Sequence, residues 1–155
     1  MENLKGTTYS GLFQMQGEIF NNAFDKLSDK LALSRASDNS NHINWLLGHV
    51  LHCRFMLANM IGLQEVNPLG DQYFKAIEHK DYPGIDEIRQ HWPQISEKLL
   101  NKISSMSNED LDTRPAENKP SLSDIISFFI YHEAYHLGQI GIVRKIIGME
   151  ALKSN

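Results

Sequence analysis

The sequence predicts an all-α protein, and more closely a four-helix bundle, from two observations. Four segments carry apolar residues at three- and four-residue steps, which is the spacing of one face of an α-helix. No segment shows the regular alternation of apolar and polar residues that is typical of a half-buried strand. The chain has 155 residues, enough for one domain to bury a core of its own, so we expect residues 1–155 to form a single domain.

The first two predicted helices are joined by a short polar stretch. The first runs from about Thr8 to Leu31. The second runs from about Asn41 to Ile61. Ser40 or Asn41 can accept hydrogen bonds from the amides of its first turn, and Gly62 can end it.

The third and fourth predicted helices carry clearer boundary signals. The third runs from about Ile85 to Met106, and Pro93 within it predicts a kink or a later start, because proline has no N–H to donate. The fourth opens at Ser121-Leu-Ser-Asp124, which resembles a capping box with aspartate in place of glutamate. It continues to Ile147, where Gly148 can end it.

The connections between these helices differ in length. The one from Leu63 to Pro83 is long for a bundle, at about twenty residues. It is long enough to contain a short helix and to cross from one end of the bundle to the other. The connection over residues 107–120 carries two prolines and many charges, which is typical of a loop. Four helices with these connections fit a bundle.

Composition and charge exclude several classes of partner. A net charge of −4 gives no support for nucleic acid or an anionic membrane as partner. No apolar run approaches the roughly 20 residues that span a bilayer, and the N-terminus lacks a signal-peptide pattern. The single cysteine, Cys53, excludes an internal disulfide and fits a reducing compartment. We therefore expect a cytoplasmic protein with a small-molecule substrate.

A metal-binding pattern lies in the fourth predicted helix. Residues 132–136 read H-E-A-Y-H, a match to H-E-x-x-H. Residues four apart lie on one helix face, so His132 and His136 can bind one ion of zinc type at about 2.0–2.1 Å per nitrogen. The alternative is a pair of histidines hydrogen-bonded to neighbouring polar groups.

The second predicted helix supplies the candidates for a third ligand. His42 lies about 10 Å from His49 along the axis, so these two and His52 cannot all reach one ion. If the second and fourth helices are antiparallel, His49 and His52 lie about 20 and 15 Å from their shared end; if parallel, about 12 and 17 Å. The pair on the fourth helix lies about 15–21 Å from the start of that helix. These depths leave the choice between His49 and His52 open.

Two motifs together resemble a known family. The stretch G-H-V at residues 48–50, after Trp45, and H-E-A-Y-H-L-G-Q-I at residues 132–140 are similar to motifs of the DinB/YfiT-like superfamily of small four-helix-bundle metalloproteins. The resemblance covers most of the chain: its length, its four helices, the long second connection and both motifs in order. It implies an up-down-down-up bundle with a long crossover between helices 2 and 3. The second and fourth helices are then antiparallel, and a homodimer is plausible.

The resemblance also implies a set of ligands. Carried over to this chain, a divalent metal is held by His49, His132 and His136, with His52 as the alternative to His49. Zinc and nickel both suit imidazole ligands. Three protein ligands leave one position open on a tetrahedral ion, as in catalytic sites.

An open metal position makes a nucleophile at neutral pH. Water bound there loses a proton near pKa ~7, and a bound thiol is held as thiolate. We expect a metal-dependent hydrolase or a thiol-dependent transferase that takes a low-molecular-weight thiol as co-substrate. The alternative is a metal-binding stress or interaction protein with no turnover.

Two neighbours of the histidines have two possible roles each. Glu133 is either a catalytic general base, as in zinc proteases with this pattern, or part of a salt bridge at a helix–helix seam. Gln139 either orients a ligand histidine or is an ordinary interfacial glutamine. A protease is disfavoured, because no strand is predicted to hold a peptide and the third histidine of the metzincin pattern is absent. We also expect the site to open to a cavity lined by helices 2 and 4 and by residues 63–83, including Tyr73 and Phe74.

Overall fold

Six helices make up the regular structure of the described residues. The computed structural model describes residues 4–76 and 81–153, and no strand occurs within them. The four long helices are α1 (Leu4–Asn22), α3 (Ile43–Met60), α4 (Ile85–Ser105) and α6 (Leu122–Ile146), and the two short ones are α2 (Asp29–Ala32) and α5 (Asn108–Asp112). The predicted all-α bundle is confirmed.

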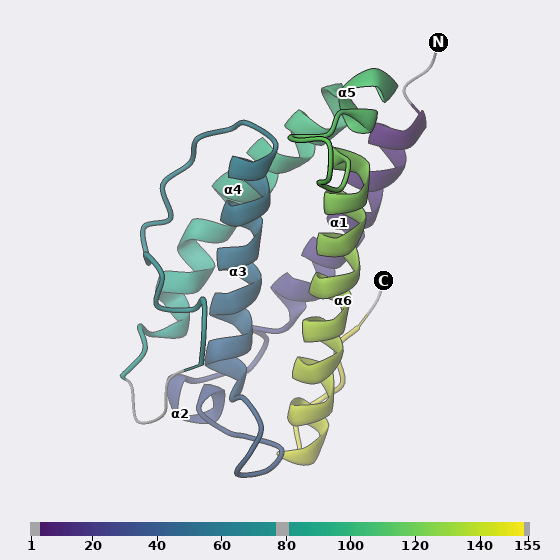
Figure 1. The fold of residues 1–155 in the computed structure, drawn as a ribbon. Helices are drawn as coiled ribbons and strands as arrows, with labels where there is room; N and C mark the ends of the chain where they lie inside the picture. Colours follow the sequence, from purple (N-terminus) through teal and green to yellow (C-terminus); the bar gives the residue numbers. More distant parts are fainter. Residues whose placement is uncertain (1–3, 77–80, 154–155) are drawn as a thin grey trace.

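The four long helices form a ring in which each packs against two others. Helix α1 packs against α4 and α6, and α3 packs against the same two helices. Figure 1 shows α3 and α4 running in one direction and α1 and α6 in the other, so the order is up-down-down-up. The connection between α3 and α4, residues 61–84, is called the crossover below. It returns along the outside of the bundle, and its described part contains turns but no helix.

Two boundaries differ from the prediction. The first helix ends at Asn22 rather than Leu31, because Lys26 adopts a φ of 55°, in the left-handed region that a helix cannot continue through. Ser28 then starts α2 by accepting a hydrogen bond from the Leu31 amide. The loop expected over residues 107–120 begins with α5, whose capping box of Ser107 and Asp110 was not predicted from the sequence.

The predicted ends of the last two long helices, α4 and α6, agree better with the structure. Helix α4 begins at Ile85 and continues through Pro93, so its start is not displaced. Ser121 and Asp124 form the expected capping box of α6. Gly148, with a φ of 79°, follows the end of that helix.

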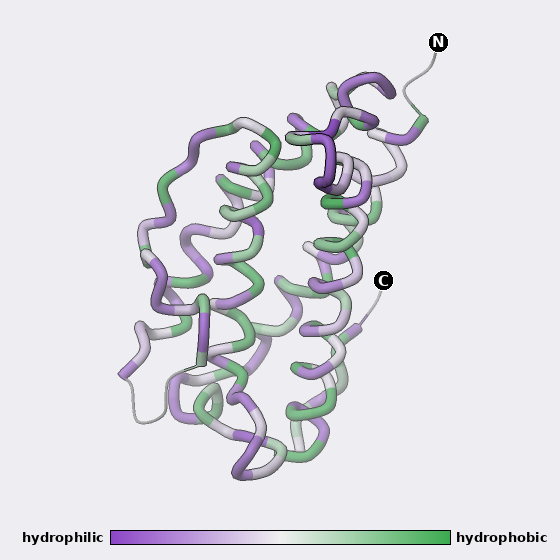
Figure 2. Tube along the Cα trace, viewed as in Figure 1, coloured by the Kyte–Doolittle hydropathy of each residue, from purple (hydrophilic) through white to green (hydrophobic). Residues whose placement is uncertain are grey.

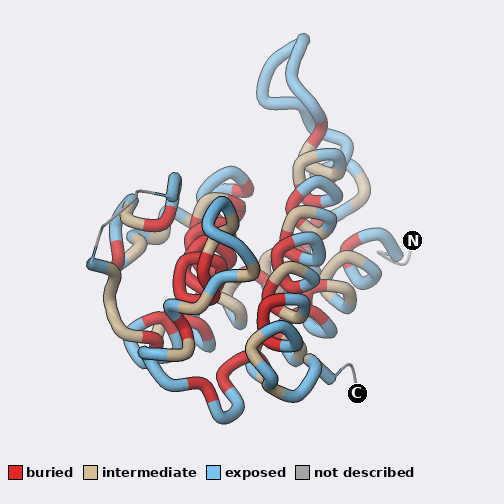
Figure 3. Tube along the Cα trace, turned by 90° about the horizontal axis from the view of Figure 1, so that it is seen from below, coloured by how far each residue is buried: buried red, intermediate tan, exposed pale blue. Residues whose placement is uncertain are grey.

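Helix α3 is the most enclosed element of the bundle. Fifteen of its 18 residues are buried, because α4 and α6 cover two sides and the crossover covers a third. Leu69 and Tyr73 of the crossover are themselves buried. Figure 3 shows the buried residues along the middle of the bundle. Because α3 is buried on most sides, a polar side chain on it is held between helices. Figure 2 shows that the stretches before α3 and before α6 are, by contrast, mainly hydrophilic. No helix in residues 4–76 or 81–153 is long and apolar enough to cross a membrane.

Candidate metal centre

Three histidines from two antiparallel helices meet inside the bundle. His49 comes from α3, and His132 and His136 come from α6. One nitrogen of each lies within 4.8 Å of the other two, and the ring centroids are 4.4–5.2 Å apart. His49 and His136 are buried, whereas His132 is half-buried, so the group faces outward at His132.

The spacing of the two α6 histidines fits one metal ion. Their Nε2 atoms are 3.1 Å apart. Two nitrogens bound at about 2.0–2.1 Å to a tetrahedral ion lie roughly 3.3 Å from one another. The pair therefore already has about the separation of two ligands of one ion, and the candidate nitrogen of His49 lies within 4.8 Å of both.

Hydrogen bonds orient two of the three rings. His49 Nδ1 lies 2.7 Å from the Tyr73 carbonyl oxygen, and His136 Nδ1 lies 2.7 Å from Oε1 of Gln139. Since these oxygens only accept, each Nδ1 carries the proton and donates it, so each Nε2 presents a lone pair that can bind a metal. In the structure, Nε2 of His136 accepts from Nε2 of His132 at 3.1 Å. Of the two roles considered for Gln139, the structure has the one that orients a histidine.

A glycine lets the crossover reach His49. A Cβ built on Gly48 would lie 2.2 Å from two carbons of the Tyr73 ring, so only glycine fits this approach. The Tyr73 side chain is fully buried, and its hydroxyl donates to Oδ1 of Asn44 at 3.2 Å. The G-H-V motif thus pairs a candidate ligand with the glycine that admits the carbonyl orienting it. From the sequence, Tyr73 was expected only at the wall of a cavity, and this role was not predicted.

Burial keeps the three imidazoles neutral. It lowers the pKa of His49 to about 4, and it also lowers the pKa of His132 and of His136. A metal ion binds the neutral form of histidine, so near pH 7 it would displace few protons from these rings. The donor set is that of a transition-metal site.

His52 lies apart from this group. Its Nδ1 is 3.1 Å from Nδ2 of Asn67 and 3.3 Å from the Gly70 carbonyl oxygen, so the ring faces the crossover rather than α6. The histidine of α3 that joins His132 and His136 in the cluster is therefore His49, and the alternative, His52, is not part of it.

Glu133 forms an ion pair at a helix–helix seam. Its two carboxylate oxygens accept from Arg54 Nη2 at 2.6 Å and Nε at 2.9 Å, and the two side chains are 3% and 1% exposed. Arg54 also donates to the Phe13 carbonyl oxygen and stacks 4.0 Å above the Trp92 ring. Of the two roles considered for Glu133, this is the salt bridge. The sequence offered no sign of Arg54 as its partner.

Aromatic rings and one thiol surround the histidines. Trp45 stacks on His49 with ring centroids 4.5 Å apart, and Phe128 stacks on His132 at 5.5 Å. Cys53 Sγ lies 3.6 Å from His49 Nε2, and burial raises the pKa of this thiol to about 12. The thiol therefore donates weakly to the nitrogen that a metal would take.

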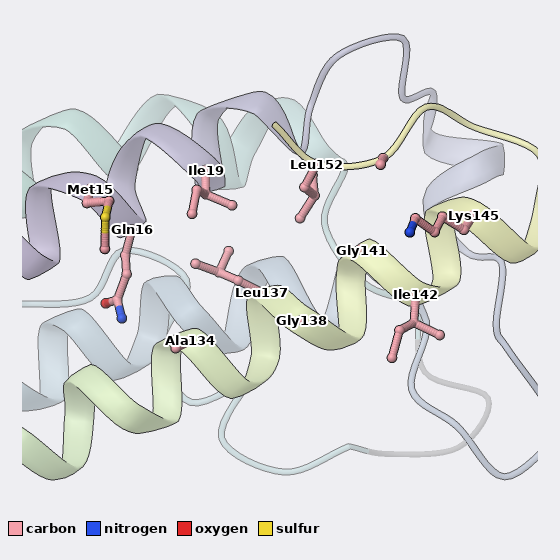
Figure 4. A pocket seen from close by; sticks show the side chains of 11 residues that line it. Met15, Gln16, Ile19, Ala134, Leu137, Gly138, Gly141, Ile142, Lys145 and Leu152 are labelled. Atoms are coloured by element: carbon pink, nitrogen blue, oxygen red, sulfur yellow. The ribbon is translucent and has the colours of Figure 1, made fainter. Parts of the chain in front are cut away.

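The expected single cavity is divided between two grooves. One of about 470 Å³ is lined by α3 and residues 67–74, including Phe74, without a contribution from α6. Another of about 800 Å³ lies between α3, α6 and the end of the α5–α6 connection. A third, of about 440 Å³, lies between α1 and α6, where Gln16 points toward α6 and Leu152 covers Gly141 (Figure 4). None of the three clustered histidines is among the residues that line these grooves, so the prediction that the site opens to one such cavity is not confirmed.

Comparison with known protein families identifies a match that covers most of the chain. The family model of the DinB superfamily matches residues 12–140, a range that contains all three clustered histidines. No curated protein matches the chain.

Proposed function

The chain belongs to the DinB superfamily, and from this premise we propose that it is a metal-dependent enzyme acting on a small molecule. His49, His132 and His136 hold one divalent transition metal, zinc or nickel, through their Nε2 atoms. The observation that carries the proposal is the meeting of three neutral imidazoles with two Nδ1 atoms already engaged by Tyr73 and Gln139.

The metal, when bound, supplies a Lewis acid that makes water or a thiol a nucleophile at neutral pH. The chain's residues hold and enclose it. Gln139 and the Tyr73 carbonyl keep two imidazoles in the binding tautomer, and Trp45 covers His49. The half-buried His132 marks the side on which a substrate reaches the site.

Two reactions use such a nucleophile. A hydrolase delivers the activated water to a small ester or amide, and a transferase delivers the thiolate of a low-molecular-weight thiol to an electrophile. The same site serves a metal-binding protein without turnover if no exchangeable position remains on the ion.

Metal content tests the ligand set. Wild type, His49→Ala, His132→Ala and His52→Ala are washed with a mild chelator, offered zinc or nickel, and measured by mass spectrometry. We expect about one ion per chain in wild type and in His52→Ala, the matched control one turn away on α3, and none in the other two. A wild type that retains neither metal would overturn the proposal, as would retention in His49→Ala.

A second measurement separates an enzyme from a binder. The cobalt(II)-loaded protein is titrated with a small thiol while its visible spectrum is recorded. A spectral change shows an exchangeable position on the ion, as an enzyme requires. A spectrum that stays constant indicates a closed site and favours the non-catalytic alternative.

A further inference from the structure

The groove of about 800 Å³ between α3 and α6 is strongly apolar. Seven of the nine residues that line it are apolar, and the other two are Lys119 and Asp124. Met56 and Met60 of α3 form one wall and adapt readily to ligands of different shape. The volume lies within the range of about 300–1,000 Å³ that is usual for small-molecule sites. We call this feature the methionine groove.

The inner wall of the methionine groove adjoins the histidine cluster. Phe128 and Phe129 line the groove, and their ring centroids lie 5.5 and 6.3 Å from that of His132. Phe128 stacks on the His132 ring at an angle of 27°. His132 is also the half-buried member of the cluster. A ligand in the groove is therefore separated from the outward side of the candidate metal site by one aromatic ring.

The outer wall is preformed and carries one charge of each sign, from Lys119 and Asp124. The connection before α6 is tied by hydrogen bonds from the Leu122 amide to the Thr113 carbonyl and from Arg114 to the Lys119 carbonyl, at 2.9 and 2.8 Å. Figure 3 shows this connection projecting from the bundle. The Asp124 carboxylate accepts from the Ser121 amide and hydroxyl, so its charge is already stabilised. Lys119 supplies the cation that lines the groove, with Glu117 two residues before it in the same turn.

We propose that the methionine groove binds the substrate of this protein, a small anionic molecule with an aromatic or aliphatic body. The body packs between the methionines and the phenylalanines, the anionic group lies near Lys119, and the reacting atom lies at the Phe128 side of the groove, one ring away from His132. The role as substrate site rests on the proposed function, whereas binding of such a molecule does not depend on the metal.

The anionic dye 1-anilinonaphthalene-8-sulfonate, whose fluorescence rises in apolar sites, tests binding directly. Met60→Glu is the test variant and Met15→Glu is its control, because the two methionines are 48% and 49% exposed and Met15 lines the α1–α6 groove of Figure 4. We expect saturable binding to wild type and Met15→Glu, and at least ~10-fold weaker binding to Met60→Glu, since a carboxylate placed in an apolar groove is costly to desolvate. Loss in Met15→Glu with retention in Met60→Glu would overturn the proposal.

Two further variants separate the charge and the metal. Lys119→Met should weaken binding of the anionic dye and leave binding of the neutral dye Nile red unchanged; equal effects on both dyes would overturn the anionic assignment. His136→Ala should still bind the anionic dye. In wild type loaded with paramagnetic cobalt(II), the proton signals of the bound dye should broaden, and in His136→Ala they should not. Bound dye without broadening overturns the link to the metal, whereas wild type that binds dye but no metal overturns the proposed function alone.

Discussion

Gly48 determines how closely the crossover approaches His49. The Tyr73 ring occupies the space in which a side chain at position 48 would lie, and the Tyr73 carbonyl oxygen accepts from His49. The absence of a side chain at Gly48 therefore allows Tyr73 to orient His49, the next residue of the G-H-V motif.

Gly48→Ala should destabilise the fold and weaken metal binding. A Cβ at 2.2 Å from the Tyr73 ring forces the crossover away from α3. We expect a loss of about 1–3 kcal/mol in the free energy of unfolding, measured with urea, because overpacked sites cost this much. Gly11→Ala is the control: nothing lies within 4 Å of the added methyl, so helix propensity should stabilise it by about 0.5–1 kcal/mol. Equal effects of the two substitutions would contradict the close approach.

Gln139 fixes the tautomer of His136 through one hydrogen bond. Gln139→Leu removes the acceptor at similar volume and should lower zinc affinity by about 10–100-fold, in a competition titration with a coloured chelator. Gln139→Glu keeps an acceptor at the same place and should retain the affinity. If Gln139→Glu lost as much as Gln139→Leu, the glutamine would serve packing rather than orientation.

At the scale of the elements, the Arg54–Glu133 pair joins α3 to α6 on the seam that faces α1 and α4. Both side chains are almost fully buried, so removing one partner leaves the other charge unpaired. Glu133→Ala should cost about 3–5 kcal/mol in unfolding free energy, and Arg54→Leu with Glu133→Leu should recover most of it. Loss of the exposed Lys5–Asp112 pair in Asp112→Ala should cost at most about 1 kcal/mol.

Metal content distinguishes this account from a direct role of Glu133 at the ion. Glu133→Gln should fold with about one metal ion per chain, since both carboxylate oxygens bind Arg54. A large loss of metal in a folded Glu133→Gln protein would place the carboxylate at the metal site instead.

The start of α3 depends on a neutral histidine. His42 Nδ1 accepts a hydrogen bond from the Trp45 amide at 3.0 Å, and burial, followed by repulsion from Arg35, lowers the pKa of His42 to about 4. Because the folded pKa lies below the ordinary value of 6.5, the unfolded chain takes up the proton first. Stability from this cap is fully present above pH 6.5 and is lost as the pH falls toward 4.

His42→Asn should flatten this pH dependence. Asparagine is a good N-cap that does not titrate. From the two pKa values, His42 contributes on the order of 3 kcal/mol to the change in unfolding free energy between pH 6.5 and 4. Urea denaturation at a series of pH values measures the slope, which His49 and the α6 pair also steepen. A slope in His42→Asn as steep as in wild type would contradict the assignment.

At the scale of the whole molecule, the sequence predicted what depends on local periodicity and missed what depends on distant contacts. Helical spacing and the Ser121–Asp124 cap lie within a few neighbouring residues and were visible. The pairing of Arg54 with Glu133, 79 residues apart, was not. Depth along a helix could not separate His49 from His52, because three residues change the direction of a side chain by about 300° and only packing decides which direction faces α6.

The metal should therefore stabilise the bundle by joining α3 to α6. An ion that binds only the folded chain adds about 2.7 kcal/mol at a concentration 100 times its dissociation constant. For a chain of this size, about 2–4 °C per kcal/mol predicts a rise in the melting temperature of roughly 5–11 °C, measured by circular dichroism with and without zinc or nickel. His52→Ala should show the full rise and His136→Ala almost none, since His136 lies in the cluster and His52 faces the crossover. The same rise in His136→Ala would mean that the ion binds elsewhere, and the two helices would then be held together by packing alone.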